Sequence, residues 1–120
     1  MGLETVYVFG NEHISQDNFA LQVAKKIRKR KIRHCYSPEE IFEDNKPAVI
    51  IDVVKGAKKP LLIDDVSALK TRKILSMHDF DLAFFIRLME EMGINKKIRI
   101  IGVPERGDAA KAAKEVLKWI

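Results

Sequence analysis

The sequence contains a single cysteine, Cys35, so one chain can form no internal disulfide. It has no apolar run long enough for a signal peptide or a membrane-spanning helix, and we therefore expect a cytoplasmic protein with no membrane partner. Glycine is scarce, with 6 residues in 120, and only Gly10 is available after the first apolar run. This shortage argues against a glycine-rich loop that binds phosphate.

The length and composition of the chain indicate one globular domain covering residues 1–120, because a chain of this length with 47% hydrophobic residues can build a single core. The net charge is +5, and much of the excess lies in "KKIRKRKIR", residues 25–33. Aromatic residues do not interleave with this cluster, so we interpret it as a solvated helix end and expect no nucleic-acid partner. A docking surface for an acidic protein is the intermediate alternative. Nothing in the sequence indicates the oligomeric state.

Apolar runs rich in β-branched residues predict strands that alternate with helical patterns. The predicted strands cover residues 5–10, 32–36, 47–54, 61–63 and 97–104. The predicted helices begin near Gln16 or Asp17, at Pro38, at about His78 and after Asp108. This alternation predicts an α/β fold with three layers, α/β/α, around a mostly parallel twisted sheet of about five strands.

Several residues have types that favour helix ends. Ser37 and Glu40 fit a capping box around Pro38, Asp108 fits an N-cap, and Gly93 fits the position after a helix C-terminus. Apolar residues also recur at helical spacing before Gly93, which predicts a helix with one apolar stripe. The residues of that stripe are Phe80, Ala83, Phe84, Leu88 and Met92.

Three ionisable residues are expected near the carboxyl edge of the sheet, where ligands bind in open α/β folds. Asp17 follows the first strand, Asp52 lies near the end of the central strand, and His78 opens the long helix. Two carboxylates and an imidazole are suitable donors for a divalent metal such as nickel or zinc, and they leave coordination positions open for water or a substrate donor. Their spacing matches no short metal-binding motif.

Each of these residues also has a structural interpretation. Asp17 is a suitable N-cap for the first helix. Ser76 and Asp79 fit a capping box, and His78 then fits an exposed residue in the first turn of the long helix. Asp52 is harder to explain in this way, because a buried carboxylate costs several kcal/mol unless it is paired, hydrogen-bonded or metal-bound. Cys35 fits a small buried strand residue better than a nucleophile.

The segment "FGNEHISQDNFALQVAKKI" resembles the opening of the hydrogenase maturation proteases. "IIDVV", "SMHDFDLAFFIRLMEEMG" and "IRIIGVPERG" are similar to the family's central strand, its long helix and its late strand, in the same order. The residues that carry the resemblance specifically are Gly10, Asn11, Asp17, Asp52 and His78. The chain departs from the family pattern at Gln16 and Asn18, and it is shorter than most members, as in a reduced archaeal-type form.

The resemblance implies an endopeptidase, of the aspartyl type, that removes the C-terminal extension of a nickel-iron hydrogenase large-subunit precursor after nickel insertion. Asp17, Asp52 and His78 would then recognise nickel that arrives with the precursor, and zinc or cadmium can replace nickel in crystals. No catalytic residue and no general base are assigned. Two alternatives are a non-catalytic relative that binds the precursor or a metal, and a receiver-like signalling domain.

Overall fold

The computed structural model describes residues 5–9, 18–27, 30–36, 38–43, 46–54, 56–63, 87–94 and 97–120. Its centre is a five-stranded sheet, formed by the five apolar runs that the sequence predicts. The strands are β1 (Thr5–Phe9), β2 (Lys31–Cys35), β3 (Ala48–Val53), β4 (Leu61–Ile63) and β5 (Ile98–Val103). All six residues of β3 are buried, as expected for a central strand that is covered on both faces.

The strand order is β2-β1-β3-β5-β4. β1 pairs in parallel with both β2 and β3, β3 pairs in parallel with β5, and the short edge strand β4 is antiparallel to β5. The chain leaves β1 toward one side to form β2 and then returns to the other side of β1 to form β3. The strand order therefore reverses at β1 and β3, and their carboxyl ends border the place where such sheets bind ligands.

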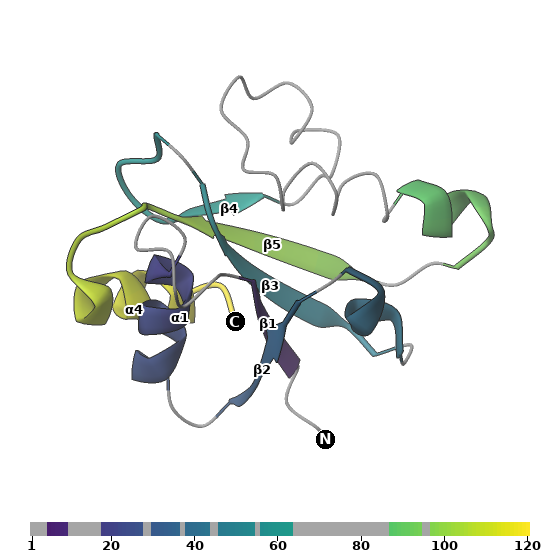
Figure 1. The fold of residues 1–120 in the computed structure, drawn as a ribbon, viewed down its shortest axis with the longest axis horizontal. Helices are drawn as coiled ribbons and strands as arrows, with labels where there is room; N and C mark the ends of the chain where they lie inside the picture. Colours follow the sequence, from purple (N-terminus) through teal and green to yellow (C-terminus); the bar gives the residue numbers. More distant parts are fainter. Residues whose placement is uncertain are drawn as a thin grey trace.

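Helices α1 (Phe19–Lys26) and α4 (Ala109–Leu117) cover one face of the sheet (Figure 1). The apolar residues of α1, Phe19, Ala20, Val23 and Ala24, are buried there. Alternate residues of the strands are buried with them, because successive strand side chains point to opposite faces. Val8, Ile51 and Ile101 contribute from β1, β3 and β5, and Val116 contributes from α4. The two helices and the sheet thus form one continuous apolar core.

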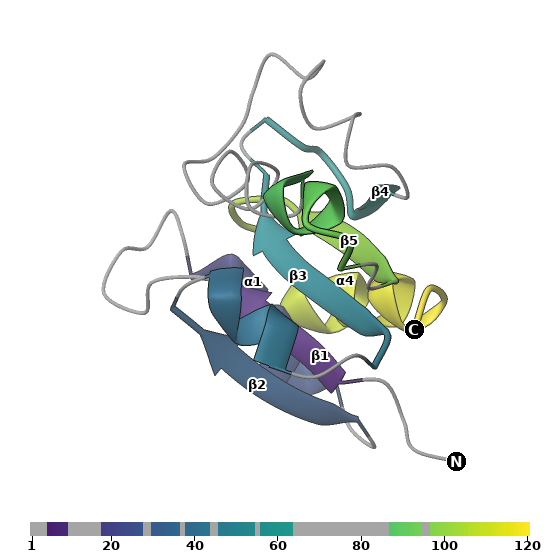
Figure 2. The same ribbon diagram turned by 90° about the vertical axis from the view of Figure 1, so that its right-hand side faces the viewer.

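The opposite face carries a smaller core with residues Tyr7, Phe9, Ile50 and Ile100 from the sheet. Ile41 of the 3₁₀ helix η2 (Pro38–Glu43) is fully buried against it, and Figure 2 shows η2 on the side of the sheet opposite α4. The predicted three-layer α/β/α architecture is confirmed. The predicted helix begins at Pro38 as expected, although it has 3₁₀ and not α geometry and its backbone is non-helical at Phe42.

Two of the predicted helix ends are confirmed. Asp108 caps α4, since its carboxylate accepts hydrogen bonds from the N–H groups of Ala110 (3.0 Å) and Lys111 (3.2 Å). Gly93 has φ +83° and ends the helical residues 87–91. The N–H of Ile94 reaches back to the carbonyl of Met89, five residues earlier, which is the bond of a Schellman motif.

The apolar stripe before Gly93 is described only at its end. Leu88 is 39% exposed and Met92 is 64% exposed, so this end of the stripe is not buried. Phe80, Ala83 and Phe84 lie outside the described residues. Helical spacing identifies which residues share a face, but it does not show whether another element covers that face.

Candidate functional site

Asp52 is the one buried acidic or basic residue in the described part of the chain, with 0% of its surface exposed. It is the fifth residue of β3, so it lies near the carboxyl end of the central strand, as predicted. One carboxylate oxygen accepts a hydrogen bond from the backbone N–H of Val53 at 2.9 Å. The strand therefore holds this carboxylate close to its own backbone at the ligand-binding edge of the sheet.

The neighbours of Asp52 across the sheet are the ends of β1 and β5. Asp52 pairs with Gly102 of β5, and the preceding pair, Ile51 with Val8, places Asp52 next to the end of β1 at Phe9. The segment that carries Asp17 follows Phe9 in the chain. Asp52 thus lies where the strand order reverses. β1 and β3, the two strands that the resemblance associates with the site, end side by side at this point.

Gly102 is a site neighbour that the sequence reasoning did not single out. A Cβ atom at Gly102 would lie 2.5 Å from Cγ2 of Val54, a distance that packed side chains do not tolerate. Paired residues of parallel strands point to the same face, so Gly102 shares a face with Asp52, and the side chain of Val54 fills the space that a larger residue at Gly102 would need. A glycine inside an otherwise apolar strand run is a signal of such close approach, and it could have been noticed.

Asp17 and His78 lie outside the described residues. α1 begins at Phe19, slightly later than predicted, and its N-cap is Asn18, whose side chain makes no capping hydrogen bond with the helix backbone. The side-chain oxygen of Asn18 instead accepts a hydrogen bond from the Gln22 side chain at 2.7 Å. Within the described ranges, no three His, Cys, Asp or Glu residues gather closely enough to hold a metal ion.

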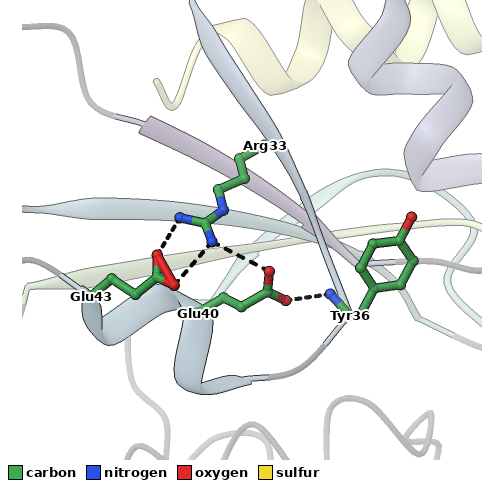
Figure 3. Close-up of polar contacts among 4 residues, drawn as sticks. All are labelled: Arg33, Tyr36, Glu40 and Glu43. Carbon is green, nitrogen blue, oxygen red and sulfur yellow. Dashed lines mark hydrogen bonds and ion pairs between the residues drawn. The ribbon is translucent and has the colours of Figure 1, made fainter.

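A second cluster of ionisable residues lies at the edge strand β2. The Arg33 guanidinium donates to both carboxylate oxygens of Glu43, at 2.6 and 3.1 Å, and contacts Glu40 at 3.4 Å (Figure 3). The other oxygen of Glu40 accepts from the N–H of Tyr36 at 2.6 Å. Glu40 thus reaches back beyond the predicted N-cap Ser37, which lies outside the described residues, and the cluster connects η2 to β2.

Cys35 lies beside this cluster and is buried. Burial raises the pKa of the Cys35 thiol to about 12; the negative charge of Glu40 acts in the same direction, and Arg33 opposes it. The thiol is therefore protonated near neutral pH and is a poor nucleophile. This agrees with the interpretation of Cys35 as a small buried strand residue.

The sequence profile of the HycI hydrogenase maturation protease family matches residues 39–116, which is more than half of the chain. The chain belongs to the hydrogenase maturation protease family. This is a family of peptidases, so the resemblance seen in the sequence is confirmed and the receiver-like alternative is set aside. The matched region includes Asp52 and His78.

Solved structures agree with this fold. The chain is similar to the hydrogenase maturating endopeptidase HybD from E. coli, with 17% identity, a TM-score of 0.66, and coverage of 98% of this chain and 91% of that one. It is similar to a hydrogenase 3 maturation protease, with 16% identity, a TM-score of 0.65 and coverage of 98% and 88%. It is also similar to the [NiFe] hydrogenase maturation protease HycI from Thermococcus kodakarensis KOD1, with 18% identity, a TM-score of 0.58 and coverage of 96% and 90%.

No curated protein matches the chain significantly in sequence. In the part of the chain that the structure describes, no helix is long and apolar enough to cross a membrane.

Proposed function

We propose that this protein is an endopeptidase that removes the C-terminal extension of a nickel-iron hydrogenase large-subunit precursor. The proposal rests on membership of the hydrogenase maturation protease family, together with one observation of this chain. That observation is the fully buried carboxylate of Asp52 at the carboxyl end of the central strand. A carboxylate buried at the edge where such sheets bind ligands supports a role in function, because perturbed ionisable groups gather at functional sites.

We further propose that Asp17, Asp52 and His78 recognise the nickel ion that the precursor brings with it. A carboxylate in a water-poor site is a good ligand for a divalent cation, because the cation replaces the water that burial removes. Asp52 is held by β3, which packs on both faces, so its position is fixed before the precursor binds. Asp17 and His78 would complete the ligand set from the segment after β1 and from the segment before residue 87.

In this proposal the protein's own contribution to cleavage is to orient the precursor. Metal ligands on rigid strand ends hold the nickel-bearing part of the precursor, and the scissile peptide bond is brought to the same edge of the sheet. The bound nickel supplies a Lewis acid that can polarise a carbonyl group or activate a water molecule. Cys35 is protonated at neutral pH and is therefore a poor nucleophile, so the proposal assigns it no part in cleavage.

The direct test is to incubate the purified protein with nickel-loaded precursor and, in parallel, with nickel-free precursor, and to measure the intact mass of the large subunit. We expect a shortened large subunit from the nickel-loaded precursor and none from the nickel-free one. A stable complex in which the nickel-loaded large subunit keeps its full mass would show instead a non-catalytic relative. Equal cleavage of both precursors would contradict nickel recognition.

A further inference from the structure

A basic pocket of about 400 Å³ opens between the loop from β3 to β4 and the loop from β5 to α4. Figure 1 shows both loops on the side of the sheet where β3 and β5 end. The volume lies within the usual range of about 300–1,000 Å³ for ligand pockets. Four cationic residues line it: Lys58, Lys59, Arg106 and Lys111.

The acids of this pocket already have partners. Asp108 accepts hydrogen bonds from the first turn of α4, and Glu115 forms an ion pair with Lys118 at 3.6 Å. By contrast, no described residue forms an ion pair with any of the four cations of the basic pocket. The pocket therefore presents a surplus of positive charge, and a partner that binds there is expected to carry negative charge.

The surroundings of the pocket favour carboxylates of a peptide over phosphate or nucleic acid. The N–H groups at the start of α4 are occupied by Asp108, so they do not offer the anion site that a helix N-terminus usually gives to phosphate. Phe19 is the aromatic residue in the lining, and it is only 2% exposed, so it cannot stack on a base. The open groove with lysines at its rim fits an extended acidic segment.

The pocket is close in the fold to the edge that carries Asp52. Gly102, the partner of Asp52 in the sheet, is followed two residues later by Pro104, which lines the pocket. Asp52 points to the face of η2, whereas the pocket lies beside α1 and α4 on the other face. A peptide bound in the pocket that continues along the carboxyl edge of the sheet, at about 3.3 Å per residue, would pass the end of β3 that carries Asp52 within a few residues.

We infer that the basic pocket binds an acidic segment of the protein substrate and so holds the chain that crosses the edge beside Asp52. This inference rests on the proposed function for the identity of the substrate, which is the large-subunit precursor. The family resemblance assigns nickel recognition to other residues. Lys58, Lys59, Arg106 and Lys111 are thus substrate-docking residues and not catalytic ones.

The test compares two variants with the same change of charge. Lys58→Glu/Lys59→Glu reverses two charges of the basic pocket, and Arg87→Glu/Lys97→Glu reverses two exposed charges outside both the pocket and the basic cluster of residues 25–33. Binding of nickel-loaded precursor is measured by calorimetry at two salt concentrations. We expect binding to weaken about tenfold in the pocket variant and by less than about twofold in the control, because the lost attraction becomes repulsion only in the pocket.

The wild-type affinity is also expected to fall with added salt, since exposed charges are screened. Equal affinity of the pocket and control variants for the precursor would overturn the inference while leaving precursor cleavage intact. Precursor that is neither bound nor cut by the wild-type protein would instead overturn the proposed function.

A probe unrelated to hydrogenase separates these two failures. In NMR titrations with a hexaglutamate peptide, we expect shifts of the backbone amides of Gly107 and Lys111 in the wild type and the control variant, and none in the pocket variant. Shifts confined to amides outside the basic pocket would overturn the inference. Stronger shifts of the same amides with single-stranded DNA would also overturn it, in favour of a nucleic-acid partner.

Discussion

Asp52 and Arg33 both point from the sheet toward the face of η2, yet their environments differ in kind. Arg33 lies on the edge strand β2, its side chain is 37% exposed, and it pairs with Glu43 and Glu40. Asp52 lies on the central strand and is fully buried. Exposed ion pairs at an edge cost little and contribute little, whereas a buried carboxylate is costly to keep. The comparison supports a structural role for the Arg33 cluster and is consistent with the proposed functional role of Asp52.

The largest expected effect of a single change is the loss of processing in Asp52→Asn. Changing a residue that only hydrogen-bonds to a metal ligand lowers activity by about 10- to 100-fold. Removing the ligand itself should therefore slow cleavage by about a hundredfold or more, which corresponds to roughly 2.7 kcal/mol. Asparagine keeps the size and an oxygen that can accept from the N–H of Val53. We therefore expect the urea midpoint to be unchanged or higher. Full cleavage by this variant would contradict the functional role.

The next effect is on stability, at the residue beside Asp52. Gly102→Ala adds a Cβ that would lie 2.5 Å from Cγ2 of Val54, and overpacking of this kind costs about 1–3 kcal/mol in urea unfolding. Val54→Ala removes the Cγ2 atom that the new Cβ would overlap, so the double variant should lose less stability than the two single changes added together. Strict additivity of the two losses would show that the close contact does not limit this position.

A smaller effect is expected at the Arg33 cluster. Arg33→Ala removes the double hydrogen bond with Glu43, and we expect a fall of a few degrees at most in the melting temperature, with precursor cleavage unchanged. Arg33→Lys keeps the charge but not the two-pronged geometry, so it should recover only part of the loss. The deficit should shrink at high salt. A loss of cleavage in folded Arg33→Ala would show that this cluster belongs to the site.

The smallest expected effect is an absence of reaction at Cys35. A pH of 8 is far below the thiol pKa of about 12, so the thiol is protonated, and it is also buried. We expect the folded protein to react with Ellman's reagent much more slowly than the protein unfolded in urea. Raising the pH from 8 to 9 should leave the folded protein largely unreactive. Rapid stoichiometric reaction of the folded protein at pH 8 would contradict this description of Cys35.

The fold was predictable because its strands and helices carry strong local signals. The apolar run of β3, interrupted only by Asp52, predicts a buried central strand, and Asp108 predicts the start of α4 through its preference for the N-cap. The position of Asp52 near the end of β3 followed from the same run. These features depend on residues that are close in the sequence.

The contacts that were not predicted join residues that are distant in the sequence. Leu61 pairs with Gly102 in antiparallel orientation, and no local pattern specifies either the partner or the direction of such a short strand. Arg33 pairs with Glu43 only because β2 and η2 pack together. The basic pocket likewise forms from Lys58, Lys59 and Arg106 when the ends of two strands meet. Asp17 and His78 stay predictions.

The most direct test of the central claim is anomalous scattering at the nickel absorption edge from crystals of this protein grown with nickel ion. The account predicts a peak at bonding distance from a carboxylate oxygen of Asp52, with Asp17 and His78 as the other protein ligands, and no such peak in crystals of Asp52→Asn. A nickel peak elsewhere, with the Asp52 carboxylate turned to protein groups alone, would contradict the claim that Asp52 is kept buried in order to recognise the metal.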